Sequence, residues 1–64
     1  MPVITMTLGR TALETRKQLI GELSRRASEL TNIPTDHFVV FIHELEDSSI
    51  GVGGQPLDEI KQQN

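Results

Sequence analysis

The first apolar pattern along the chain is a strict alternation over residues 3–8, V-I-T-M-T-L. Ile4, Met6 and Leu8 would lie on one face of a strand, and the β-branched residues between them on the other. Alternation of this kind, rich in β-branched residues, is typical of a half-buried β-strand. Because a glycine and an arginine then break the pattern, we predict that the first strand ends there.

The apolar spacing then changes to that of an amphipathic helix, which we predict to run to about Leu30. Its apolar stripe has successive spacings of seven, three, four and three residues, as expected for one helical face. The members of the stripe are Leu13, Ile20, Leu23, Ala27 and Leu30. Arg16 falls on the same stripe. We interpret it as a cation that extends from the edge of the stripe to water, rather than as a ligand.

Polar residues mark both ends of this helix. Thr11 and Glu14 fit a capping box, in which the hydroxyl and the carboxylate accept hydrogen bonds from free N–H groups. Asn32 tolerates the left-handed conformation and Pro34 cannot continue a helix, so the helix is predicted to stop near them. The outer face is predicted to be solvated and salt-bridged. Its charges are Glu22, Arg25, Arg26 and Glu29.

Residues 38–42 form a continuous apolar run, F-V-V-F-I. Such a run is typical of a strand that is buried on both faces, as in parallel sheets. A strand, a helix and a second strand make a right-handed β-α-β unit with parallel strands, so the fold class is α/β (α+β). One helix covers only one face of the sheet. We therefore expect another copy of the chain to cover the other face, which makes the protein a homo-oligomer.

The C-terminal part is rich in glycine and polar residues. Residues 48–54, S-S-I-G-V-G-G, predict a turn and a short β-ribbon, since glycine adopts unusual dihedral angles. A phosphate-binding loop is disfavoured because neither a lysine nor a helix start follows the glycines. Residues 55–64 are expected to be frayed or wrapped on a neighbouring subunit. Because the chain has only 64 residues, we predict a single domain, residues 1–64.

The composition further limits the possible partners and location of the protein. A 64-residue domain buries only about 60% of its unfolded surface, and the absence of cysteine leaves oligomerisation as the means of stabilising it. A net charge of −3, scattered basic residues and two aromatic residues argue against nucleic-acid binding. No apolar run approaches the ~20 residues of a membrane span, and no signal segment is recognisable. We expect a cytoplasmic protein without a membrane partner.

The usual chemistry-bearing side chains nominate no active site. His37 and His43 are six residues apart, so on one strand they would be roughly 20 Å from each other and could not share a metal. We interpret both as bystanders at the strand ends. Glu44, Glu46 and Asp47 are interpreted as a solvated strand end rather than a catalytic carboxylate pair. We therefore expect neither a metal nor a cofactor.

Pro2 is the remaining candidate. Proline is small enough for the preceding methionine to be removed, which would leave a free secondary amine. An α-amino group has a pKa of about 7.7–8.0, and apolar burial or a nearby cation lowers it toward the range that suits a general base. Arg10, just after the first strand, is the natural cation and could pair with a substrate carboxylate. The alternative is a proline that is merely tolerated at a strand entrance.

Several motifs together resemble the small subunits of the 4-oxalocrotonate tautomerase family. They are M-P-V-I-T-M at the start, L-G-R before the long helix, and V-V-F-I-H-E-L followed by I-G-V-G-G. The resemblance covers essentially the whole chain. It implies a β-α-β tautomerase fold assembled as a hexamer (a trimer of dimers) or a dimer. It also implies that the amine of Pro2 moves a proton between the enol oxygen and a carbon of an α-keto acid.

The resemblance also assigns the substrate-binding positions. Pro2 matches the catalytic proline, and Arg10 matches the arginine of the family's G-R motif. Val39 stands where the family has a second arginine, and Ile50 where it has an aromatic residue. The expected substrate is therefore a 2-hydroxy-dienoate or another α-keto acid enol, other than the family's doubly charged one. Two alternatives stay open: a dehalogenase-like or hydratase-like relative, and a catalytically weak or non-catalytic oligomer with this fold.

Overall fold

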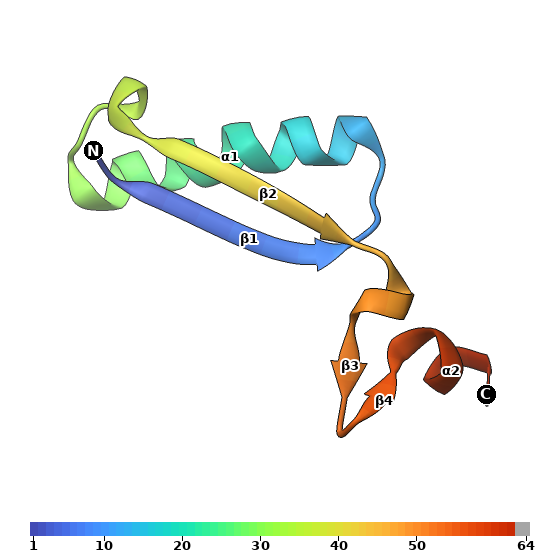
Figure 1. The fold of residues 1–64 in the computed structure, drawn as a ribbon. Coiled ribbons are helices and arrows are strands. Elements are labelled where there is room, and N and C mark those ends of the chain that lie inside the picture. The colour runs from blue at the N-terminus through green and yellow to red at the C-terminus, as the bar shows by residue number, and fades with distance from the viewer. Residues whose placement is uncertain (63–64) are drawn as a thin grey trace.

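The computed structural model describes residues 1–62 and consists of a β-α-β unit followed by a small C-terminal arm (Figure 1). The helices and strands are β1 (Val3–Gly9), α1 (Leu13–Thr31), β2 (Val39–Leu45), β3 (Gly51–Val52), β4 (Gln55–Pro56) and α2 (Leu57–Gln62). Two short 3₁₀ turns, Thr35–His37 and Asp47–Ser49, precede and follow β2. We use "C-terminal arm" for residues 46–62.

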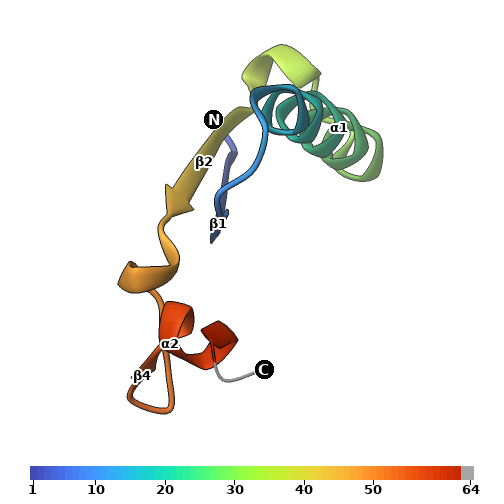
Figure 2. The same cartoon turned by 90° about the vertical axis from the view of Figure 1, so that its right-hand side faces the viewer.

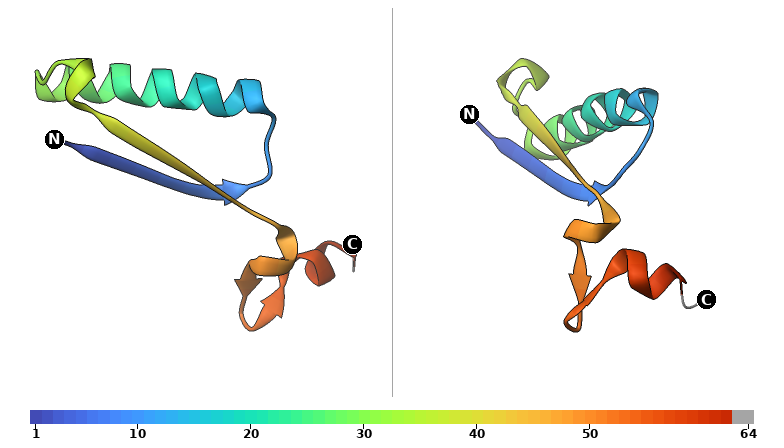
Figure 3. Two further views of the ribbon diagram at one scale, coloured as in Figure 1. Left: turned by 45° about the horizontal axis from the view of Figure 1, so that its top comes forward. Right: turned by 45° about the vertical axis from the view of Figure 1, so that its right-hand side comes forward.

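Strands β1 and β2 are parallel neighbours, in a register that runs from the pair Val3–Val39 to the pair Gly9–Leu45. The N–H of Val39 also donates to the carbonyl of Pro2 at 3.0 Å, which extends the pairing by one residue. Helix α1 crosses from one strand to the other on a single face of this sheet (Figures 2 and 3). The β-α-β arrangement predicted from the apolar pattern is confirmed.

The two faces of the sheet differ in cover. The face toward α1 carries Ile4, Met6, Leu8, Val40 and Ile42, all half-buried. The opposite face, which we call the open face, carries the half-buried Val39 and six exposed residues, Val3, Thr5, Thr7, Phe41, His43 and Leu45. The expectation of burial on both faces is therefore met on one face of the single chain, and Phe41 is 51% exposed on the other. No side chain among residues 1–61 is fully buried.

Helix α1 ends as predicted but starts differently. Asn32 has φ 60° and its N–H donates to the carbonyl of Ser28 at 2.9 Å, the left-handed end that the sequence indicated. The capping box is wrong, because Ala12 occupies the N-cap position and no side chain caps it. A carboxylate from β2 approaches this end instead: Glu44 accepts a hydrogen bond from the N–H of Thr11 at 2.7 Å.

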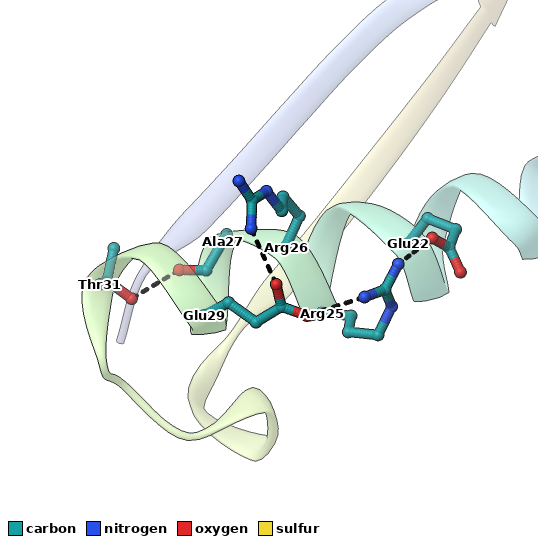
Figure 4. Close-up of polar contacts among 6 residues, drawn as sticks. All are labelled: Glu22, Arg25, Arg26, Ala27, Glu29 and Thr31. Carbon is teal, nitrogen blue, oxygen red and sulfur yellow. Dashed lines mark hydrogen bonds and ion pairs between the residues drawn. The ribbon is translucent and has the colours of Figure 1, made fainter.

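The outer face of α1 carries the predicted ion pairs (Figure 4). Arg25 bonds both Glu22 and Glu29, and Arg26 contacts Glu29 at 2.9 Å. The hydrogen bond to Glu22 and the charge of that residue, followed by those of Glu29, raise the pKa of Arg25 above its usual value. At the far end, the hydroxyl of Thr31 donates back to a carbonyl one turn earlier, at 2.7 Å.

The apolar stripe of α1 is only partly covered. Leu23 and Ala27 are half-buried against the sheet. Leu13, Ile20 and Leu30 are 54%, 42% and 68% exposed in the single chain. Three of the five residues of the stripe predicted to face the core are therefore largely uncovered within the same chain.

The C-terminal arm leaves the sheet beyond the end of β2 (Figures 1 and 3). Gly53 and Gly54 have φ of 60° and 84° and turn the predicted ribbon, β3 and β4. The prediction of a frayed end is wrong for residues 57–62, which form α2; residues 63–64 lie outside the described part. The radius of gyration is 15.3 Å. A compact domain of this length would have about 11 Å, so the arm makes the chain elongated.

Candidate functional site

Pro2 lies at the entrance to β1, at the end of the sheet where the chain begins (Figure 1). It is half-buried, whereas Met1 in front of it is 87% exposed. Its backbone is joined to Val39 by the hydrogen bond described above. The predicted base and the position at which the family's second arginine is missing are therefore direct neighbours in space.

Arg10 lies at the opposite end of the same strand. Residues 3–9 are all in β1, so Pro2 and Arg10 are eight residues apart along an extended chain. At ~3.3 Å per residue, that places their backbones about 26 Å apart. This exceeds the length of an arginine side chain several times over. A single chain does not bring the two residues together.

Arg10 carries a carboxylate partner from its own chain. Its Nη2 lies 2.6 Å from Oε1 of Glu46, with side chains 74% and 62% exposed. Arg10 also borders two open clefts. One, of about 520 Å³, is lined by Gly9, Arg10, Glu46, Asp47, Ser48, Asp58 and Lys61. The other, of about 420 Å³, is lined by Arg10, Thr11, Glu44 and Glu46. In the single chain, the carboxylate that Arg10 faces is that of Glu46.

Glu44 has a different environment from the solvated strand end that we predicted. It shares the helix-facing side of β2 with Val40 and Ile42, since all three alternate along the strand. Its Oε1 lies 3.2 Å from Nη1 of Arg16, and its Oε2 accepts the N–H of Thr11. The Nε of Arg16 is buried without a hydrogen-bond partner within the described chain. Arg16 is thus an ion-pair partner and not merely a cation at the edge of the stripe.

The two acidic residues that follow β2, Glu46 and Asp47, also form ion pairs. Glu46 contacts Arg10, and Asp47 lies 2.9 Å from Nζ of Lys61 on α2. Their partners are 36 and 14 residues distant in sequence, so local spacing gave no signal for these pairs. Along β2, Glu44 follows the apolar residues Val40 and Ile42 at every second position. This alternation is the one signal in the sequence that could have indicated its partial burial.

Ile50 lies in the C-terminal arm, after the second 3₁₀ turn, and is half-buried. Its carbonyl accepts the N–H of Leu57 at 2.7 Å, which joins the first part of the arm to the start of α2. The four predicted site residues therefore form two groups. Pro2 and Val39 lie at one end of the sheet, and Arg10 and Ile50 lie toward the other.

The two histidines lie outside both groups. His37 is in the 3₁₀ turn that follows Pro34, so the prediction that both histidines share one strand is wrong. His43 is on the open face of β2, with its ring stacked on Phe41 at 6.4 Å between centroids. Among the described residues, no group of three His, Cys, Asp or Glu side chains is arranged to hold a metal ion. In the same part of the chain, no helix is long and apolar enough to cross a membrane.

The parallel β-α-β unit with its glycine-turned ribbon is shared with solved structures of other proteins. The family model described as "Tautomerase enzyme" matches residues 2–60. The chain belongs to the tautomerase family, and its neighbours place it with the 4-oxalocrotonate tautomerases. The protein therefore has a function of the tautomerase superfamily, and it is an enzyme of the isomerase type.

Individual relatives agree over nearly the whole chain. A protein named "Probable tautomerase" from Bacillus cereus is 36% identical over 61 residues, which is 92% of this chain and 98% of that protein. The crystal structure of DmpI from Helicobacter pylori is 28% identical, with a TM-score of 0.84 over 98% of this chain and 100% of that chain. A heterohexameric 4-oxalocrotonate tautomerase from Chloroflexus aurantiacus J-10-fl is 29% identical, with a TM-score of 0.78. The match covers 94% of this chain and 98% of that chain.

Proposed function

We propose that this protein is a keto–enol tautomerase in which the amine of Pro2, freed by removal of Met1, is the general base. The observation that carries the proposal is the family match, which begins at residue 2 and so has Pro2 as its first residue. The proposed substrate is a 2-hydroxy-dienoate or another enol of an α-keto acid. No cofactor or metal takes part in the proposed reaction.

The surroundings of Pro2 support its role as a base. Pro2 is half-buried beside Val39, and Val3 follows it in the chain, so its immediate neighbours are apolar. Burial disfavours the charged form of an amine, and a nearby guanidinium does the same. Both effects would lower the pKa of the proline amine toward neutral pH, where a general base is most effective.

The proposed proton transfer balances within one substrate molecule. The neutral proline nitrogen takes the proton of the enol hydroxyl, and the oxygen becomes a carbonyl as the conjugated electrons shift. The protonated proline then returns the same proton to a carbon of the chain. An arginine paired with the substrate carboxylate holds the molecule in place and stabilises the developing negative charge.

We propose that this site is completed between copies of the chain. Pro2 and Arg10 are about 26 Å apart in one copy, so Arg10 can act beside Pro2 only if it comes from another copy. The open face, with Phe41 51% exposed, supports association, as does the elongated shape. The relative from Chloroflexus aurantiacus is a heterohexamer. We propose a homo-hexamer, built as a trimer of dimers, or a dimer, for this protein.

The test is the amine itself. In methionine-free protein, Pro2→Ala should lose most tautomerase activity, because a primary amine at that position differs in pKa and geometry. A protein that keeps Met1 should also be inactive, since its proline nitrogen is an amide. Titration of the Pro2 amine should give a pKa below that of an ordinary α-amino group. The control is Pro34→Ala, at an exposed proline before a 3₁₀ turn. Unchanged turnover in Pro2→Ala would exclude Pro2 as the base.

A further inference from the structure

The cation proposed to bind the substrate carboxylate is already occupied in the free chain. Glu46 contacts Nη2 of Arg10 at 2.6 Å. A guanidinium offers a carboxylate two edges with two nitrogens each, and both edges include Nη2. Nη2 has two hydrogens, one toward each edge, so Glu46 engages one of them. A substrate carboxylate that approaches Arg10 therefore competes with Glu46 at one edge and meets a neighbouring negative charge at the other.

The register of the sheet brings Glu46 to this position. Gly9 pairs with Leu45 as the last pair of the parallel ladder, so Arg10 and Glu46 are the next residue on each strand. On the other side of Arg10, the N–H of Thr11 is held by Glu44. The backbone on both sides of Arg10 is thus fastened to β2, which keeps its side chain beside that of Glu46.

Both side chains also line the same two clefts. Any anion that binds Arg10 there either displaces the carboxylate of Glu46 or shares the guanidinium with it. Displacement is feasible because the side chains are 74% and 62% exposed, and exposed ion pairs are weak.

We infer that Glu46 is a specificity-determining residue that competes with the substrate carboxylate for Arg10. The inference rests on the proposed function, because it takes Arg10 as the residue that binds the substrate. By this competition Glu46 weakens the binding of every carboxylate substrate. It weakens the binding of a dianion more, because the second negative charge enters the same cleft.

The test compares Glu46→Gln with Asp47→Asn in the assembled, methionine-free protein. Each variant removes one negative charge from the same cleft, but Asp47 pairs with Lys61 and not with Arg10. With 2-hydroxy-2,4-pentadienoate, Glu46→Gln should lower KM about two- to five-fold, the range for one exposed ion pair, with kcat little changed. Asp47→Asn should have less than half of that effect. With 2-hydroxymuconate, the decrease in KM for Glu46→Gln should be larger.

Arg10→Ala separates this inference from the proposed function. Arg10→Ala should raise KM, and in that background Glu46→Gln should no longer lower it. Equal effects of Glu46→Gln and Asp47→Asn would overturn the inference, since the general charge of the cleft would explain both. An increase in KM for Arg10→Ala with no decrease for Glu46→Gln would overturn the role of Glu46 alone. An unchanged KM in Arg10→Ala would overturn the proposed role of Arg10 and, with it, this inference.

Discussion

Val39 lies beside Pro2, and under the proposed function it would limit which substrates bind there. Its backbone N–H is used by the carbonyl of Pro2, and its side chain offers neither a charge nor a hydrogen bond. A hydrogen bond to a charged group is worth about 1.5–3 kcal/mol. If the substrate binds at Pro2 as proposed, valine at position 39 supplies no such contribution for a second carboxylate.

We therefore predict little discrimination between a monocarboxylate and a dicarboxylate dienol. The measurement is kcat/KM for 2-hydroxy-2,4-pentadienoate against 2-hydroxymuconate. Val39→Arg should shift the preference roughly ten- to a hundred-fold toward the dianion, the factor that one charged hydrogen bond supplies. Val52→Arg, at a 59% exposed position in the arm, is the control and should leave the preference unchanged. A wild-type preference above a hundred-fold for the dianion would mean that another cation replaces the missing arginine.

Helix α1 is the element that joins the two parallel strands, and its two ends are stabilised in different ways. Its C-terminal end depends on a local signal, the left-handed Asn32, whose φ is 60°. Its N-terminal end receives Glu44 from a strand 33 residues later. A local motif can be read from neighbouring residues. The contact with Glu44 cannot be read from neighbouring residues, because it forms only when the helix packs on the sheet.

The C-terminal end of α1 gives a stability prediction. Asn32→Ala should lower the free energy of unfolding by about 1 kcal/mol, because a left-handed conformation is costly for a residue with a β-carbon and no polar group. Asn32→Gly is the matched control and should be neutral or slightly stabilising, since glycine adopts this conformation freely. The measurement is urea denaturation at a fixed protein concentration. Equal stability of the two variants would contradict this account.

As a whole molecule, the single chain has too little cover for its apolar surface. No residue among the first 61 is fully buried, and the exposed apolar positions include Phe41 on the sheet and Leu13 on the helix. The radius of gyration of 15.3 Å reflects the arm, which extends away from the β-α-β unit. A chain of this shape gains stability by burying the open face against other copies.

Phe41→Glu tests whether burial of the open face holds the oligomer together. A charge at the centre of the open face should break the oligomer into smaller species, because an unpaired buried carboxylate is very costly. Sedimentation at micromolar concentration should then show a smaller particle, and tautomerase activity should fall with it. Lys17→Glu, on an exposed position of α1, is the control and should leave the assembly intact. Wild-type protein that sediments as a folded monomer would contradict the proposed oligomer.

The sequence by itself determined the order of the elements up to the glycine-turned ribbon, but not α2. The alternation at residues 3–8, the helical stripe, the apolar run at residues 38–42 and the glycine pair all depend on neighbours within one turn or one strand. For the same reason it determined the left-handed end at Asn32 and the candidate Pro2. Only the tertiary structure decided which charges distant in sequence meet, because pairs such as Arg10 with Glu46 depend on the register between the two strands. The separation of Pro2 from Arg10 was decided there too, since the parallel strand keeps them at opposite ends of the sheet.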